Sequence, residues 1–185
     1  MKNNFNIYKN EIFKNLAKRN NVLYGNKLKC LRQSLLLKPE DLAAVLTIST
    51  NTIKKAEQGG NVGIEIINEI VLFYGFTIDQ FYSTDSVPNW QDFKKQIEKF
   101  HKEHKSESYK IINQRPQLID LIEYRLLKSD FFKQWVDEDQ LLEFCNREYN
   151  YNYSSATNTL NNCVQKGWLI IDENAKPKKY SLKKK

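Results

Sequence analysis

The chain has 185 residues and a formal net charge of +7, with 29 Lys and Arg residues against 22 Asp and Glu residues. This length predicts one or two domains, and 41% hydrophobic residues are enough to build their cores. No run approaches the roughly 18 apolar residues of a membrane span, and the N-terminus lacks the apolar region of a signal peptide. We therefore expect a cytoplasmic protein without membrane contact, whose basic excess suits a polyanionic partner.

Catalytic and metal-binding patterns are weak in this sequence. The cysteines, Cys30, Cys145 and Cys163, are far apart and form no CxxC pair, which predicts free thiols in a reducing compartment. The histidines, His101 and His104, have no further ligand residues at metal-site spacing, so we expect solvated side chains. The sequence thus predicts no metal, no cofactor and no enzyme, and a nuclease would need a carboxylate or histidine cluster that the pattern does not supply.

Residues 1–20 carry Phe5, Tyr8, Ile12 and Leu16 at helical spacing, which predicts an added helix. Its apolar stripe could pack on its own domain or on a second copy of the chain. A separate helix is expected from about Val22, with a buried face of Leu28, Leu31 and Leu35.

Two short helices joined by a tight turn are predicted between residues 37 and 60. Their inner faces are apolar: Leu42, Ala43 and Leu46 in the first, Ile53 and Ala56 in the second. Ser49 or Thr50 can cap the second helix, because a hydroxyl there accepts a backbone N–H, and Gly59 can end it with a positive φ. This is the spacing of a helix-turn-helix, whose second helix can enter the DNA major groove.

Residues 24–82 resemble the five-helix domain of the Xre/Cro-repressor family. The resemblance rests on the spacing from LKCLR through EDLA and AEQG to FYGFTIDQF. It implies a DNA-binding domain in which Arg32 of the first helix pairs with Glu57, at the end of the recognition helix, in a structural role. Where the family usually has a Ser-Gln pair with a phosphate contact, this chain has Lys38-Pro39, and Lys38 is the candidate substitute.

The outward face of the second motif helix holds side chains suited to reading DNA. The candidate contacts of the first domain are Lys38, Thr50, Asn51, Thr52, Lys54, Lys55 and Gln58. Residues at the N-terminus of a recognition helix meet bases first, so Thr50, Asn51 and Lys54 are the expected base readers. Lys55 and Lys38 are the expected phosphate contacts. The alternative is a polar face that is simply solvated.

A polar break at residues 83–88 predicts a domain boundary. The next stretch, residues 89–104, is an amphipathic helix with a stripe of Trp90, Phe93, Ile97 and Phe100. This stripe is too apolar for a free linker. It could form a dimer seam, by packing on a second copy of the chain, or an intramolecular brace, by packing within its own chain.

Residues 114–185 resemble a winged helix. Three helices are expected, the first with Pro116 at its first position and the third capped by Ser154, followed by strands at 168–172 and 178–182. The resemblance makes the third helix and the hairpin the candidate DNA-contacting elements. The candidate residues are Ser155, Thr157, Asn158, Asn161, Lys176, Lys178 and Lys179. Winged helices also serve as dimer or partner modules, so DNA and protein contact are both open.

The predicted fold is mainly α. It comprises a five-helix repressor-like helix-turn-helix domain with an extra N-terminal helix (1–84), an amphipathic connector helix (85–113) and a winged helix with a small β-hairpin (114–185). The expected function is sequence-specific transcriptional regulation by a homodimeric repressor on double-stranded DNA. The alternative is an antitoxin or adaptor whose C-terminal domain binds a protein partner.

Overall fold

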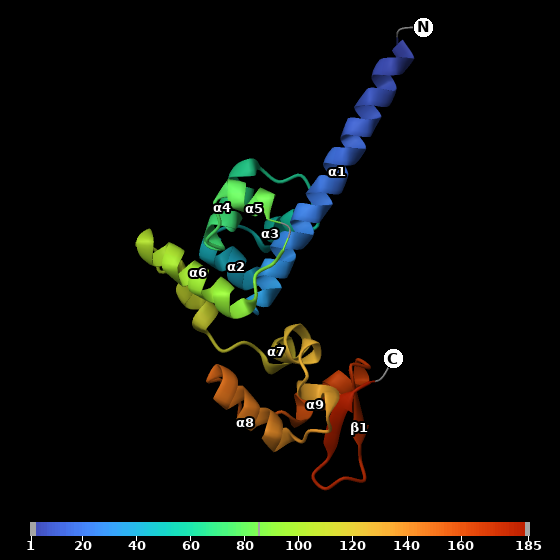
Figure 1. Ribbon diagram of the computed structural model, residues 1–185, viewed down its shortest axis with the longest axis vertical. Helices are drawn as coiled ribbons and strands as arrows, with labels where there is room; N and C mark the ends of the chain where they lie inside the picture. The colour runs from blue at the N-terminus through green and yellow to red at the C-terminus, as the bar shows by residue number, and fades with distance from the viewer. Residues whose placement is uncertain (1–2, 85, 184–185) are drawn as a thin grey trace. The chain divides into compact units, whose positions relative to one another are not determined.

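The computed structural model describes residues 3–84 and 86–183, without the side chains of residues 3–10, 12 and 13. The described chain is mainly helical with a small antiparallel sheet near the C-terminus, as the sequence predicts (Figure 1). It divides into two compact units: unit 1 is Met1–Gln114 and unit 2 is Arg115–Lys185.

The helices of unit 1 follow one another with short connections. They are α1 (Asn3–Ser34), α2 (Pro39–Leu46), α3 (Thr50–Glu57), α4 (Ile64–Phe73), α5 (Ile78–Ser83), α6 (Trp90–Glu103) and the 3-10 helix η1 (Ser108–Asn113). One core joins them, in which Leu42, Ile53 and Phe81 are fully buried. Ile64, the first residue of α4, lies at the surface and is 56% exposed.

Helix α1 differs from the prediction of two separate helices. It is one continuous helix of 32 residues, and Leu36 is the first residue after it with a left-handed backbone. Asn20 and Asn21 do not interrupt it, because neither residue adopts a turn conformation there. Leu28, Leu31 and Leu35 are buried as predicted.

The described side chains in the N-terminal half of α1 do not pack on unit 1. Glu11 and residues 14–20 all have exposed side chains, and Leu16 is 49% exposed. The alternative in which this stripe packs on its own domain is therefore wrong at Leu16. The predicted stripe residues Phe5, Tyr8 and Ile12 lie outside the described side chains.

Helix α6 is an intramolecular brace. Asn89 caps it by accepting the N–H groups of Gln91 and Asp92, and Phe93 and Ile97 are fully buried in the core of unit 1. The expected connector is therefore part of this unit, and of the two alternatives for its stripe the brace is the one observed.

Packing of α6 against the end of α4 also buries His101. Its Nε2 lies 2.9 Å from the carbonyl oxygen of Phe73 and its Nδ1 lies 3.0 Å from Oγ of Ser106. The prediction of a solvated side chain is wrong for His101, which is 5% exposed, whereas His104 is exposed as predicted.

Unit 2 combines helices with a hairpin. Its elements are α7 (Leu118–Tyr124), η2 (Leu126–Lys128), η3 (Phe131–Lys133), α8 (Glu138–Tyr149), α9 (Thr157–Gln165), β1 (Leu169–Asp172) and β2 (Lys179–Leu182). The strands pair antiparallel, with Leu169 opposite Leu182 and Asp172 opposite Lys179. Strand β2 also bridges Val136 on its other side, through reciprocal backbone hydrogen bonds between Val136 and Tyr180 of 3.0 and 2.8 Å.

The helix starts of unit 2 differ from the predicted ones. Pro116 precedes α7 instead of opening it, and Gln117 is the N-cap residue. The N-cap residue of α9 is Ala156, not Ser154. An alanine has no side-chain acceptor, so another residue must satisfy the first N–H groups of α9.

Candidate nucleic-acid interface

The turn between α2 and α3 sets the direction of α3. Thr47 ends α2 in a left-handed conformation at φ 56°, and Ile48 packs against the core as a partly buried residue. Ser49 then caps α3, because its Oγ accepts the N–H of Thr52 over 3.1 Å. The Thr52 hydroxyl lies 2.8 Å from the same Oγ, so this predicted DNA contact takes part in the cap.

A buried ion pair fixes the C-terminal end of α3 to α1, which confirms the predicted pairing of Arg32 with Glu57. The guanidinium donates from Nε and Nη2 to the two carboxylate oxygens over 2.6 and 2.8 Å. Nη1 donates to the Leu37 carbonyl over 2.7 Å. Both side chains are 7% exposed. A two-pronged pair of this kind is rigid, so the helix cannot rotate freely about its axis.

The outward face of α3 is open to solvent. Asn51, Lys54, Lys55 and Gln58 are exposed and Thr50 is partly buried. All five therefore occupy one accessible polar face opposite the buried Ile53 and Ala56.

Two of the predicted lysine contacts, Lys54 and Lys38, have different surroundings. Lys54 forms an exposed ion pair of 3.1 Å with Glu40. Backbone hydrogen bonding at the start of α2, and then the hydrogen bond from Lys54, lower the pKa of the Glu40 carboxyl. A base or phosphate would have to compete with Glu40 for Lys54. Lys38, the predicted phosphate contact, is partly buried ahead of α2, and its backbone N–H donates to Asp41 over 2.7 Å.

A polar hollow of about 280 Å³ adjoins α3 and contains a cation that the sequence analysis did not select. Lys29 of α1 lines it together with Lys54 and Gln58, and Lys29 is exposed. Its position could have been found from the sequence, because Lys29 precedes Arg32 by three residues and so shares its helix face. Lys29 is an additional candidate for phosphate contact.

The backbones of α1 and α3 touch where the two helices cross. A Cβ atom at Gly25 would lie 2.5 Å from the Gly59 nitrogen, and one at Gly59 would lie 2.6 Å from the Asn21 carbonyl carbon. Gly59 also has a φ of +70°, so glycine is required there for conformation as well as space.

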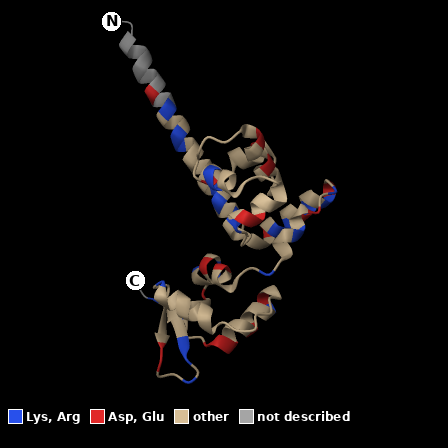
Figure 2. Cartoon of the chain, turned by 180° about the vertical axis from the view of Figure 1, so that it is seen from behind, with Lys and Arg blue, Asp and Glu red and all other residues tan. Residues whose placement is uncertain are grey.

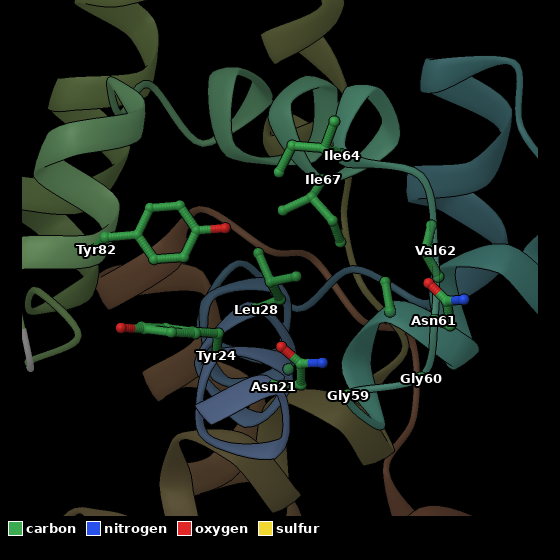
Figure 3. A pocket seen from close by; sticks show the side chains of 12 residues that line it. Asn21, Tyr24, Leu28, Gly59, Gly60, Asn61, Val62, Ile64, Ile67 and Tyr82 are labelled. Carbon is green, nitrogen blue, oxygen red and sulfur yellow. The ribbon is translucent and has the colours of Figure 1, made fainter. Parts of the chain in front are cut away.

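A small hollow opens beside this crossing (Figure 3). Asn21 and Tyr24 of α1 line it together with Asn61 and Val62, which follow α3, and its volume is about 160 Å³. Ligand pockets usually hold 300–1,000 Å³, so this hollow is too small for an effector of ordinary size.

The N-terminus of α9 is occupied by a carboxylate. Glu138 of α8 accepts the backbone N–H groups of Ala156 and Thr157 over 2.6 and 3.0 Å, and the Ser155 hydroxyl over 2.9 Å. The Thr157 hydroxyl donates to the other carboxylate oxygen. These hydrogen bonds, that of the Thr157 hydroxyl first, lower the pKa of Glu138 to about 2. Two predicted DNA contacts, Ser155 and Thr157, are thus already bonded to an anion.

The remaining candidate DNA contacts of unit 2 differ in exposure and lie near both acidic and basic residues. Asn158 and Asn161 are exposed on α9, and the Tyr180 hydroxyl donates to Asn161 over 3.3 Å. In the hairpin, Lys176 and Lys178 are exposed and Lys179 is partly buried. Acidic and basic segments face one another across this hairpin, because Asp172 is the register partner of Lys179 (Figure 2).

The described residues contain no group of three or more His, Cys, Asp or Glu that could hold a metal ion. Burial raises the pKa of the Cys145 and Cys163 thiols to about 11, so neither is a ready nucleophile. Within residues 3–84 and 86–183, the helices are too short or too polar to cross a bilayer.

Comparisons with protein-family models, with curated proteins and with solved structures found no match to this chain.

Proposed function

We propose that this protein is a sequence-specific DNA-binding regulator of transcription. In this proposal the α2–α3 pair is a helix-turn-helix of the Xre/Cro-repressor type, and α3 enters the major groove of double-stranded DNA. The supporting observation is the way α3 is held: its inner face is fixed by the buried Arg32–Glu57 pair, while its polar face is exposed.

The roles of the side chains follow from their positions on α3. Asn51 and Thr50 lie at its N-terminal end and would meet base edges, where an amide can pair with adenine. Lys55 is exposed on α3 and would neutralise a phosphate, with Lys29 beside the same helix. The chain would act as a homodimer that occludes a promoter or contacts the polymerase.

In this proposal unit 2 is a winged helix. The proposal is supported by the hairpin that follows α7, α8 and α9, in which β2 pairs with β1 and bridges Val136 on its other side. The Glu138 carboxylate at the N-terminus of α9 favours the adaptor alternative for this unit, since it repels phosphate where a reading helix would approach DNA. We propose that unit 2 contacts a protein partner and that unit 1 selects the DNA sequence.

The test is selection of bound duplexes from a random pool, followed by titrations of variants at several salt concentrations. Asn51→Ala should relax preference at one base position, at a cost of about 1–3 kcal/mol. Lys55→Ala should weaken binding to all sequences alike and reduce the salt slope by about one unit. Lys95→Ala, an exposed lysine of α6, is the matched control and should change neither. Failure to enrich any sequence would refute the proposal.

A further inference from the structure

The described side chains in the N-terminal part of α1 are exposed, and two of them are large and apolar. Leu16 and Leu23 are 49% and 59% exposed. Isolated helices shorter than about 12–15 residues are marginal in water, and most helical stability in proteins comes from packing an apolar face. The segment is also rich in asparagine, which is a poor helix former.

One side of this segment combines apolar and basic side chains. Leu16, Arg19 and Leu23 follow one another at spacings of three and four residues, so they share a helix face. Each of the three is exposed. We call residues 11–23 of α1 the arm.

A groove of about 670 Å³ lies elsewhere on unit 1, between the end of α2 and helices α4 and α6. Its walls include Leu72, which is 43% exposed, and Phe100, whose ring stacks on His104 at 4.2 Å. Phe73 lines it as a buried residue, and Glu69 is an exposed acid among its lining residues.

The arm and the groove are complementary in chemistry. The arm has exposed leucines flanked by a cation, and the groove has an exposed leucine and a phenylalanine beside an acid. An amphipathic helix laid in an apolar groove is a common recognition mode. The described residues of α1 do not line the groove of their own chain, so in this arrangement the helix that fills it would come from a second copy.

We propose that the arm of each copy docks in the groove of a second copy. In the resulting dimer Leu16 and Leu23 contact Leu72 and Phe100, and Arg19 pairs with Glu69. Mutual exchange of arms is two-fold symmetric and closed, so it yields a dimer rather than a fibre. The inference rests on the homodimer of the proposed function and specifies its contact surface.

Disulfide trapping between two differently tagged chains tests this contact, with Cys30→Ser in both to remove the exposed native thiol. One chain carries Leu16→Cys and the other Leu72→Cys. Mild oxidation should give a covalent species that contains both tags. The control pairs Leu16→Cys with Ile170→Cys, a residue of unit 2 that is 38% exposed, and should give little product.

The product pattern separates the alternatives. If Leu16 cross-links mainly to Leu16 of a second copy, the arms pair with each other and the groove is not their site. If the Leu16–Leu72 yield does not exceed the control, the inference is wrong. Because trapping requires no DNA, its failure in a protein that dimerises and binds DNA leaves the proposed function standing, and success without DNA binding refutes that function alone.

A charge exchange gives a second, reversible measurement. Arg19→Glu and Glu69→Arg should each weaken dimerisation about tenfold in sedimentation equilibrium, because two exchanged contacts acquire like charges. Both substitutions in one chain should restore the wild-type constant. Glu103→Arg, an exposed position on α6, is the control. Additive weakening in the double variant would contradict the Arg19–Glu69 contact.

Discussion

The N-termini of α3 and α9 begin two short helices of similar length, and they are capped by different chemistry. A neutral hydroxyl, that of Ser49, caps α3 and adds no negative charge at its positive end. The carboxylate of Glu138 caps α9 and accepts two backbone N–H groups there. The first helix can therefore attract a phosphate, whereas the second already holds its own anion.

The two helices also differ in where the charged residues that hold them lie. The C-terminal end of α3 is fixed to α1 by the buried Arg32–Glu57 pair, and this pair orients a helix whose outer face is exposed. In unit 2 the charged residue that contacts α9 is Glu138, which is partly buried at the N-terminus of that helix. Two short helices can thus have opposite electrostatic character at their N-termini, and the capping residue distinguishes them.

The largest expected effect is on the anchor of α3. Arg32→Ala should lower the free energy of unfolding of unit 1 by about 3–5 kcal/mol, because it leaves the Glu57 carboxylate buried without its partner. Urea unfolding followed by Trp90 fluorescence measures this in a chain with Trp135→Phe and Trp168→Phe. Lys29→Ala, one helical turn earlier and exposed, is the control. A loss below about 1 kcal/mol would mean that the pair does not hold α3.

The next effect concerns the backbone contact of α1 with α3. Gly25→Ala should destabilise unit 1 by about 1–3 kcal/mol, since its Cβ would lie 2.5 Å from the Gly59 nitrogen and both helices would have to shift. The same fluorescence assay applies. Gly63→Ala is the matched control, because the nearest atom there is the mobile end of Glu65. Equal effects at the two glycines would contradict a tight crossing.

Glu138→Gln removes the carboxylate that caps α9 and should lower the free energy of unfolding of unit 2 by about 1 kcal/mol. The value is small because the carboxylate is only partly buried. The pKa of Glu138 is lowered on folding, so its contribution is present above about pH 4.5 and disappears as the pH falls towards 2.

Unfolding followed by Trp168 fluorescence at pH 7 and pH 3, with Trp90→Phe and Trp135→Phe, should show a larger stability difference in wild type than in Glu138→Gln. Asp139→Asn, an exposed neighbour, is the control. An unchanged pH dependence in Glu138→Gln would mean that the carboxylate does not cap α9 in solution.

The smallest effect is expected from the hairpin. Replacing Lys176, Lys178 and Lys179 with Ala together should change the salt slope of DNA binding by less than one unit, because acids of the same hairpin and Glu138 offset them. Three phosphate contacts would account for about 2.7 units. A decrease of about that size in the salt slope, together with a shorter footprint, would mean that unit 2 also contacts DNA and does not differ from unit 1 in this respect.

Local patterns in the sequence were sufficient for much of this structure. The cap at Ser49, the strands of the hairpin and the Arg32–Glu57 pair follow from short spacings or from the family resemblance. The role of Glu138 was not predictable, since it is an ordinary first-turn acid of α8 and its partners lie 17–19 residues later. His101 was likewise misjudged, because its burial depends on how α6 packs against α4.

Because α1 is one continuous helix, it connects the arm directly to the helix-turn-helix. The same helix includes the arm, crosses α3 at Gly25 and ends beyond Arg32. One residue inserted between Leu16 and Asn21 would rotate the part of the arm that precedes it by about 100° relative to α3 and shift it by about 1.5 Å. In an arm-exchanged dimer, the phase of this helix would therefore set the distance and rotation between the two recognition helices, and with them the operator spacing.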